Sequence, residues 1–108
     1  MITIEQFQQI DLRVGTITAA EAIPGATKLL KLQVDLGEGT PRQLVAGIAQ
    51  HYTPEELIGK QIVVVANLQP AKIRGVESQG MLLAAVHDDQ DIVLITVDKP
   101  VPNGVKVS

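Results

Sequence analysis

The basic residues of this 108-residue sequence are grouped where they could neutralise a polyanion. Residues 60–74 contain Lys60, Lys72 and Arg74 and no acidic residue, so this segment has a charge of +3. Residues 77–108 contain five acidic residues and two lysines, which gives a charge of −3. Each phosphate that a protein neutralises needs a nearby cation and adds about −0.7 to −0.9 to the salt dependence of affinity. The charge pattern therefore predicts phosphate binding on one side of the molecule.

The sequence lacks a residue pattern that is typical of catalysis. His51 and His87 are isolated, Ser78 has no histidine and acid partner in its own region, and no glycine-rich phosphate loop follows a strand. Glu55 and Glu56 are better explained as the acidic first turn of a helix. We therefore expect no catalytic residue in this chain, and a buried carboxylate pair is the one arrangement that the sequence leaves open.

The sequence offers few residues that could bind a metal or take part in redox chemistry. The sequence has no cysteine, which excludes disulfides, zinc–thiolate sites and a cysteine nucleophile. Asp88, Asp89 and Asp91 could suggest a divalent cation, but they lack the glycine and the distal glutamate of an EF-hand loop. We interpret them as a solvated turn and expect neither a metal nor a cofactor.

The composition is that of an ordinary globular domain. Hydrophobic residues make up 45% and charged residues 19%, and the length predicts one domain covering residues 1–108. The sequence has no apolar run of membrane-spanning length, and its first twelve residues are too polar for a secretory signal. The expected location is therefore the cytoplasm. The net charge of −3 and the two aromatic residues, Phe7 and Tyr52, argue against a strongly basic protein that stacks bases. We expect Phe7 in the core.

The elements that must position the basic residues can be predicted from periodicity and capping. Thr3 and Gln6 form a capping box, and Thr53, Pro54 and Glu56 form a second helix start that Gly59 ends. A change of apolar parity in the first strand predicts a β-bulge at Gly15. The expected elements are a helix over 4–9, strands over 13–23, 30–36 and 42–48, a short helix after 53, strands over 62–68, 81–86 and 92–97, and a short final strand over 105–107. The strands over 62–68, 81–86 and 92–97 are expected to be buried on both faces, with a polar hairpin turn over 87–91.

This order predicts an all-β fold, the five-stranded Greek-key barrel of the OB-fold, with a short helix between strands 3 and 4, an N-terminal helical turn and a C-terminal β extension. OB-folds bind oligonucleotides on strands 2 and 3 and on the loops joining strands 1 to 2 and 4 to 5. On this plan Lys28 lies in the first of these loops, Lys31 on strand 2, Arg42 on strand 3, and Lys72 and Arg74 in the second loop. The alternative is that these lysines are merely solvated on strand exteriors.

The scarcity of aromatic residues limits the kinds of nucleic acid that this chain could bind. Single-stranded nucleic acid favours aromatic stacking platforms, which this chain barely offers. Folded RNA is recognised mainly by shape, phosphates and 2′-hydroxyls, which polar and basic side chains can contact. Structured RNA is therefore the more compatible partner.

Five short stretches carry a resemblance to a known family. They occur in order and with compatible spacing over nearly the whole chain: Asp11-Leu12-Arg13-Val14-Gly15, Lys28-Leu29-Leu30-Lys31-Leu32, Val45-Ala46-Gly47-Ile48, Val65-Ala66-Asn67-Leu68 and Ser78-Gln79-Gly80-Met81. Together they resemble the tRNA-binding domain found at the C-terminus of bacterial and archaeal methionyl-tRNA synthetases or as a separate small protein.

The resemblance implies a function and partners. It implies an OB barrel that binds tRNA largely independently of sequence, usually as a homodimer. It further implies a non-catalytic part of methionyl-tRNA synthetase, an aminoacyl-tRNA ligase, which assists aminoacylation in cis or in trans as a C-terminal domain or β subunit. The catalytic part of that synthetase would be a further partner. A tethered domain needs only weak binding, because tethering supplies a high effective concentration.

The resemblance also implies site residues. Lys72 and Arg74 would contact phosphates, and Asn67, Ser78 and Gln79 would donate or accept neutral hydrogen bonds. Met81 would pack against a base or, as we favour, against the barrel core. Lys28, Lys31 and Arg42 would extend the face.

Two features of the resemblance leave alternatives open. Relatives commonly carry another cation near the positions of Gln69 or Ala71, so this chain has a less positive loop than they have. A free-standing tRNA-binding protein and a secretion-related chaperone of the same fold are alternatives, and the chaperone would need an exposed apolar groove.

Overall fold

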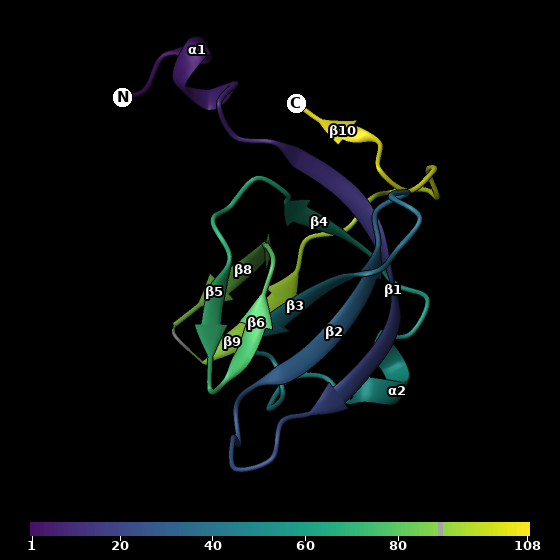
Figure 1. Cartoon of the computed structure of the whole chain (residues 1–108). Coiled ribbons are helices and arrows are strands. Elements are labelled where there is room, and N and C mark those ends of the chain that lie inside the picture. Colours follow the sequence, from purple (N-terminus) through teal and green to yellow (C-terminus); the bar gives the residue numbers. More distant parts are fainter. Residues whose placement is uncertain (89) are drawn as a thin grey trace.

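The computed structural model describes residues 1–88 and 90–108 (Figure 1). Within these residues, two single-turn helices and ten strands follow one another. They are α1 (Ile4–Phe7), β1 (Leu12–Ala22), β2 (Leu30–Asp35), β3 (Arg42–Ala46), α2 (Pro54–Leu57), β4 (Gln61–Val65), β5 (Ala71–Ile73), β6 (Val76–Ser78), β7 (Met81–Leu82), β8 (Ala84–His87), β9 (Asp91–Leu94) and β10 (Lys106–Val107).

The principal sheet is a strongly curved barrel wall built around the long strand β1. Its order is β3-β2-β1-β4-β7, every pairing is antiparallel, and β10 adds to β1. β5 with β6 and β8 with β9 form two separate hairpins on the same side of the molecule (Figure 1). The fold is therefore the predicted all-β, OB-like barrel of five strands, nearly closed, with α2 inserted between β3 and β4.

Alternation along β2 shows how the sequence builds the core. Leu30, Leu32 and Val34 are buried, whereas Lys31 and Gln33 between them are only partly buried. Successive side chains of a strand point to opposite faces, so one face of β2 lines the barrel interior while the other meets solvent. The central cluster continues through apolar residues of β1, β3, β4 and α2.

Both helices begin with the predicted capping boxes. The Thr3 and Thr53 side chains each accept a hydrogen bond from the backbone N–H three residues later. The side chains of Gln6 and Glu56 in turn accept a hydrogen bond from the backbone N–H of Thr3 and Thr53. α1 ends at Phe7, so the helix is shorter than the expected range of 4–9.

The predicted bulge at Gly15 is wrong. Ile17 pairs with Val34 and Ala19 with Gln33, so the register shift in β1 falls at the intervening threonine. Gly15 instead permits close packing, because a Cβ there would lie 2.6 Å from Val34 Cγ1. The parity change reflects two covered faces of β1, because Leu12 packs in the cluster with Val63 and Val65 whereas Ile17 packs in the central cluster.

The C-terminal part departs further from the expectation. The strand expected over 81–86, buried on both faces, is instead divided into the short strand β7 and the hairpin strand β8. Val86 and Val93 on hairpin β8–β9 are 60% and 55% exposed, and β9 ends at Leu94, so the expectation of a strand over 92–97 buried on both faces is also wrong. Pairing of His87 with Asp91 confirms the predicted hairpin there, although Asp89 lies outside the described residues. β10 confirms the predicted final strand.

Candidate nucleic-acid interface

The main basic residues lie on a hairpin, in a segment that we predicted only as a loop between two strands. β5 and β6 pair from Ala71 to Ser78, and two residues, Arg74 and Gly75, connect them. Both have positive φ, 54° and 78°, as a type I′ turn requires. The turn holds Arg74 at the hairpin tip, where its guanidinium donates a hydrogen bond to the Gly25 carbonyl at 3.2 Å. This contact joins the hairpin to the β1–β2 loop.

Arg74 and Lys28 line one cleft between those two loops. The cleft has a volume of about 350 Å³ and also includes Ala26, Thr27 and Leu29. Lys28 and Arg74 are exposed, and neither is within ion-pair distance of an acidic side chain among residues 1–88 and 90–108. The structure thus brings together two predicted site residues that are 46 positions apart in the sequence.

Lys72 lies on the same hairpin and is also exposed. It pairs across the hairpin with Glu77. The Glu77 carboxylate accepts a hydrogen bond from the Gln79 side-chain amide at 3.0 Å, and no ion pair joins it to Lys72 within the described structure. Lys72 therefore lies exposed on β5, without an acidic partner in the described structure.

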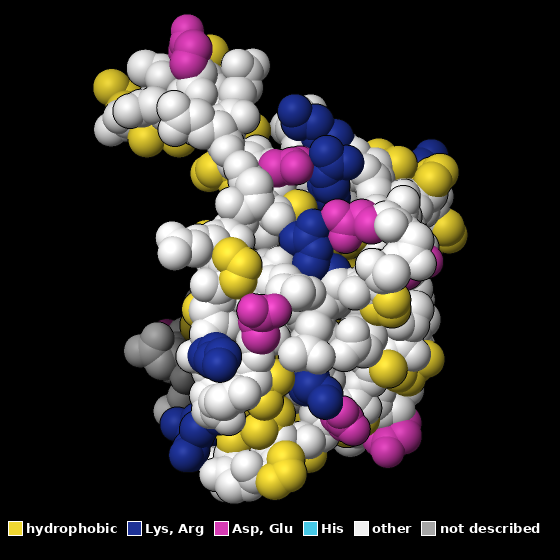
Figure 2. All heavy atoms as spheres, in the orientation of Figure 1, with side chains coloured by type: hydrophobic (Ala, Val, Ile, Leu, Met, Phe, Trp, Pro, Cys, Tyr) yellow, Lys and Arg dark blue, Asp and Glu magenta, His cyan; other side chains and the backbone are white. Residues whose placement is uncertain are grey.

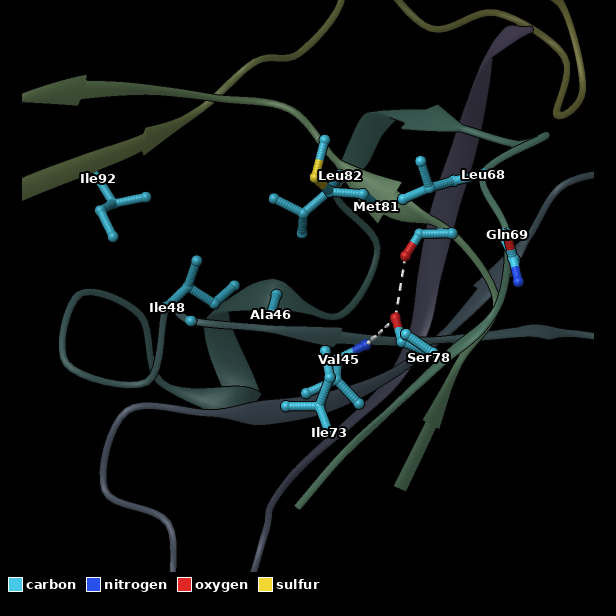
Figure 3. Close-up of a pocket in the computed structure, with 13 residues that line it drawn as sticks. Val45, Ala46, Ile48, Leu68, Gln69, Ile73, Ser78, Met81, Leu82 and Ile92 are labelled. Atoms are coloured by element: carbon cyan, nitrogen blue, oxygen red, sulfur yellow. Dashed lines mark hydrogen bonds between the residues drawn. The ribbon is translucent and has the colours of Figure 1, made fainter. Parts of the chain in front are cut away.

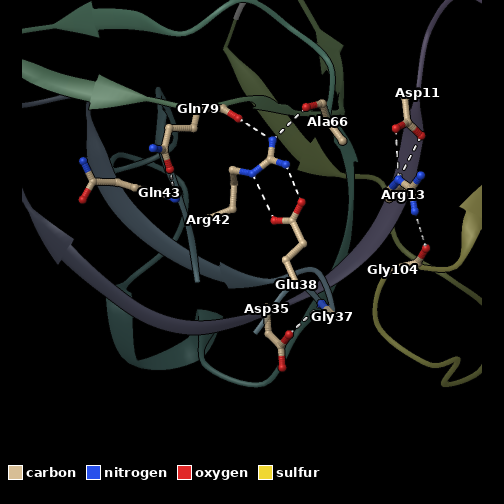
Figure 4. Close-up of polar contacts among 10 residues, drawn as sticks. All are labelled: Asp11, Arg13, Asp35, Gly37, Glu38, Arg42, Gln43, Ala66, Gln79 and Gly104. Carbon is tan, nitrogen blue, oxygen red and sulfur yellow. Dashed lines mark hydrogen bonds and ion pairs between the residues drawn. The ribbon is translucent and has the colours of Figure 1, made fainter. Parts of the chain in front are cut away.

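Arg42 occupies a different environment from Arg74. Its guanidinium donates to both carboxylate oxygens of Glu38, at 3.2 and 2.6 Å, and to the carbonyl oxygens of Ala66 and Gln79, at 2.7 and 2.8 Å (Figure 4). Its side chain is only 20% exposed. The charge of Arg42 is thus neutralised inside the fold, where it ties β3 to the ends of β4 and β6. Lys31 is similarly paired, with Glu21 at 2.6 Å.

Ser78 and Gln79 fill the gap between β3 and the end of β6. The buried Ser78 hydroxyl accepts from the Val45 N–H at 3.0 Å and donates to the Gly80 carbonyl at 2.9 Å (Figure 3). The Gln79 N–H donates to the Gln43 carbonyl at 2.8 Å, and its side chain accepts from the Gln43 N–H at 3.2 Å. Both residues therefore satisfy the backbone groups on the outer edge of β3 and close the barrel.

Asn67 fastens the N-terminal segment to the end of β4. Its side-chain oxygen accepts from the Asp11 N–H at 2.9 Å, and its amide donates to the Gln9 carbonyl at 2.7 Å. These two bonds fix the direction in which the N-terminal segment leaves the barrel.

Met81 is 47% exposed, so our preference for a core position is wrong. β7 is short and ends at Leu82, which leaves Met81 at the mouth of an apolar cavity rather than beneath a covering layer. The cavity has a volume of about 380 Å³, and its walls include Val45, Ile48 and Ile73 (Figure 3).

We predicted neither the acidic partners of Arg42 and Lys31 nor the apolar cavity from the sequence. Glu38 precedes Arg42 by four residues across a turn, a spacing that could have signalled their pairing. The dipeptide Arg74-Gly75 fits the two-residue turn of a β-hairpin, so it could have indicated the hairpin. The pairing of Lys31 with Glu21 depends on strand register, which no local pattern in the sequence reveals.

The arrangement offers fixed cations on the loop face. No group of three potential metal-ligating side chains lies together within the described ranges. None of the described helices is long and apolar enough to cross a membrane. Lys28, Lys72 and Arg74 can neutralise phosphates that approach the loop face of the barrel.

An OB-like barrel with basic loops at one end defines a class of small nucleic-acid-binding domains. Residues 12–106 match the family described as "Putative tRNA binding domain". The chain belongs to this tRNA-binding domain family.

Several relatives support the assignment. The chain is 56% identical over 106 residues to the methionine–tRNA ligase of Methanocella arvoryzae, and 57% identical over 107 residues to that of Thermotoga maritima. These matches cover 98% and 99% of this chain but only 15% and 17% of the ligases, so the chain spans about one-sixth of those relatives' length.

Solved structures show the same fold over the full chain. A MetRS-related protein from Pyrococcus horikoshii is 42% identical with a TM-score of 0.93, and the match covers 100% of this chain and 98% of that one. The chaperone CsaA from Bacillus anthracis is 40% identical with a TM-score of 0.91, with 100% and 99% covered.

Proposed function

We propose that this domain grips tRNA by its backbone at the face formed by the β1–β2 loop and hairpin β5–β6. The observation that carries the proposal is the Arg74–Gly25 hydrogen bond, which holds the hairpin tip against the loop that bears Lys28. Three cations free of acidic partners within the described structure, Lys28, Lys72 and Arg74, then face a polyanion together. Phosphate contacts position RNA without reading its sequence, so we expect binding that depends little on sequence.

The two aromatic residues support a backbone grip over base stacking on aromatic platforms. Phe7 is only partly buried, and it packs against the small cluster of Leu12, Val63 and Val65 rather than in the central core. The Tyr52 hydroxyl accepts a hydrogen bond from the Leu94 N–H at 3.1 Å. Both rings therefore serve the fold, and the RNA contacts fall to basic and polar groups.

The nine predicted site residues fall into two groups in this proposal. Lys28, Lys72, Arg74 and the exposed Met81 contact tRNA. Arg42, Lys31, Ser78, Gln79 and Asn67 act chiefly by shaping the face, because each already has partners within the fold.

We further propose a role beside methionyl-tRNA synthetase in the cytoplasm. The ligase relatives contain a matching segment within a much longer chain. A domain of this kind, attached or associated as a β subunit, raises the local concentration of tRNA near the catalytic part. It performs no step of aminoacylation itself.

We propose that the domain forms a homodimer through its N-terminal arm, residues 1–10. Figure 1 shows α1 projecting from the barrel, and Figure 2 shows hydrophobic side chains on this projection. Ile2 and Ile4 are 66% and 63% exposed. A one-turn helix is marginal in water unless packing supports it, so a second copy that covers this arm would stabilise both.

Filter binding with unfractionated tRNA at low salt tests the proposed function. Retention of tRNA with micromolar or better affinity supports it, and absence of retention at low salt overturns it. A chaperone role is the second candidate, favoured by the likeness to CsaA and by the exposed apolar cavity. Suppression of aggregation of a chemically unfolded protein, with no retention of tRNA, would favour that role instead.

A further inference from the structure

The apolar cavity and the basic cleft are neighbours at the hairpin tip. Ile73 lines the cavity, and the next residue, Arg74, lines the cleft. On the opposite wall, Ile48 lines the cavity, and the N–H of the following residue, Ala49, donates to the Lys28 carbonyl at 3.1 Å. Figure 2 shows basic and hydrophobic side chains adjoining one another over this hairpin and the β1–β2 loop. The cavity and the cleft therefore form one continuous surface, apolar on one side and cationic on the other.

The size and exposure of the cavity limit what can occupy it. Its volume of about 380 Å³ lies at the lower end of the range, about 300 to 1,000 Å³, of small-molecule pockets. Leu68, Ile73 and Met81 at its mouth are 45%, 36% and 47% exposed. The Ser78 hydroxyl inside it is already bonded to the Val45 N–H and the Gly80 carbonyl. The cavity therefore suits a single flat apolar group that needs little hydrogen bonding from the floor.

We propose that this cavity receives one unstacked nucleobase of the bound tRNA, while Lys28 and Arg74 hold the adjoining phosphate. This inference rests on the proposed function and names the part of the RNA that the site takes. A nucleotide joins a flat ring to an anion a short distance away, which matches an apolar cavity beside a cationic cleft. An apolar peptide side chain would fill the cavity but would leave the two cations without a partner.

A chain without available aromatic rings can hold a base in such a cavity. Aliphatic and thioether side chains can cover both faces of a base and remove them from water, as aromatic platforms do elsewhere. A base so held has left its stack, so folded RNA with unpaired loop nucleotides is the preferred form.

Methyl NMR of the wild-type chain tests the inference directly. AMP, UMP and ribose 5-phosphate are titrated to millimolar concentration, and the methyl signals of Leu68, Ile73 and Met81 are followed. We expect both nucleotides to shift these signals and ribose 5-phosphate to leave them in place. Equal shifts with ribose 5-phosphate, or nucleotide shifts confined to the cleft, would overturn the inference. An uncharged apolar peptide that shifts the same methyls more strongly than the nucleotides would also overturn it.

A cavity-filling variant separates this inference from the proposed function. Ala71 is exposed and lines the cavity, so Ala71→Leu fills space without altering any charge. We expect Ala71→Leu to weaken binding of unfractionated tRNA about tenfold with an unchanged salt slope. Ala19→Leu, on an exposed position of β1, is the matched control and should bind as wild type.

The outcomes are distinguishable. Wild-type affinity of Ala71→Leu, together with weakened binding of a variant lacking Lys72 and Arg74, would refute the base-binding cavity and leave the backbone grip standing. Wild-type affinity of both variants would refute the proposed site itself.

Discussion

Two arginines of this chain show why residue type alone does not define a binding site. Arg42 has four acceptor contacts inside the fold, two of them from the Glu38 carboxylate. Arg74 has one carbonyl contact at an exposed hairpin tip. A cation already neutralised by a bidentate carboxylate gains little from a phosphate, whereas an unpaired exposed cation gains a counterion-releasing contact. We therefore assign Arg42 to stability and Arg74 to binding.

Replacing Lys72 and Arg74 together by alanine should weaken tRNA binding about 10- to 40-fold at 0.1 M salt, because two phosphate contacts are lost. The thermal transition should change little, since both side chains are exposed. Fluorescence anisotropy with labelled tRNA and differential scanning calorimetry measure the two quantities. The matched control is Lys99→Ala with Lys106→Ala, which removes the same charge elsewhere. Equal loss in the control would show that the contacts are not localised.

Arg42→Ala should instead destabilise the fold by about 2 kcal/mol, because it leaves the Ala66 and Gln79 carbonyls and the Glu38 carboxylate without their donor. Urea unfolding of Arg42→Ala and of the double variant Arg42→Ala/Glu38→Gln measures the effect, and removing the orphaned charge should recover part of the loss. Unchanged stability with strongly reduced tRNA affinity would show that Arg42 belongs to the binding face.

The outer edge of strand β3 is closed by two side-chain bonds and one backbone bond in place of a full strand pairing. Ser78 and Gln79 supply the bonds that a continuous fifth strand would make to β3. This device leaves hairpin β5–β6 outside the barrel wall, where its tip can meet the β1–β2 loop. The binding face therefore depends on how the barrel closes.

Ser78→Ala should cost about 1 to 3 kcal/mol, because the buried Val45 N–H loses its acceptor. Hydrogen exchange should speed up at Val45 and at neighbouring β3 amides. Ser108→Ala at the exposed terminus is the control and should leave both quantities unchanged. Wild-type stability of Ser78→Ala would show that water or a neighbouring group replaces the hydroxyl.

Local patterns predicted the elements better than the contacts between them. The capping boxes at Thr3 and Thr53 and the alternation along β2 follow from nearest neighbours, so the sequence reveals them. The role of Gly15 depends on how closely β2 approaches β1, which alternation alone misrepresented as a bulge. The exposure of Met81 and the pairing of Arg42 with Glu38 likewise depend on where β7 and the β2–β3 turn lie in space.

At the scale of the whole molecule, apolar exposure is uneven. The N-terminal arm carries Ile2 and Ile4 on a projection that Phe7 and the Asn67 bonds anchor to the barrel. Figure 1 shows the arm at the end of the molecule away from the β1–β2 loop, so pairing two copies through it would leave both basic faces open to tRNA. Pairing would raise the apparent affinity without any new contact in either site.

Ile4→Glu should convert the proposed dimer to a monomer, because a charged side chain would be buried at the interface. Sedimentation velocity at micromolar concentration measures the association state. Ile58→Glu is the control, since Ile58 is similarly exposed, at 49%, but follows α2. A monomeric wild type, or an Ile4→Glu variant that remains dimeric, would contradict the role of the arm.

If free cations at one loop face grip tRNA by its phosphates, the slope of log K against log salt must reflect those contacts. With unfractionated tRNA between 0.05 and 0.2 M salt, three phosphate contacts predict a slope of about −2 to −3 for the wild-type chain. Loss of Lys72 and Arg74 should make that slope shallower by about 1.5. A wild-type slope near zero, or an unchanged slope in the variant, would contradict the account.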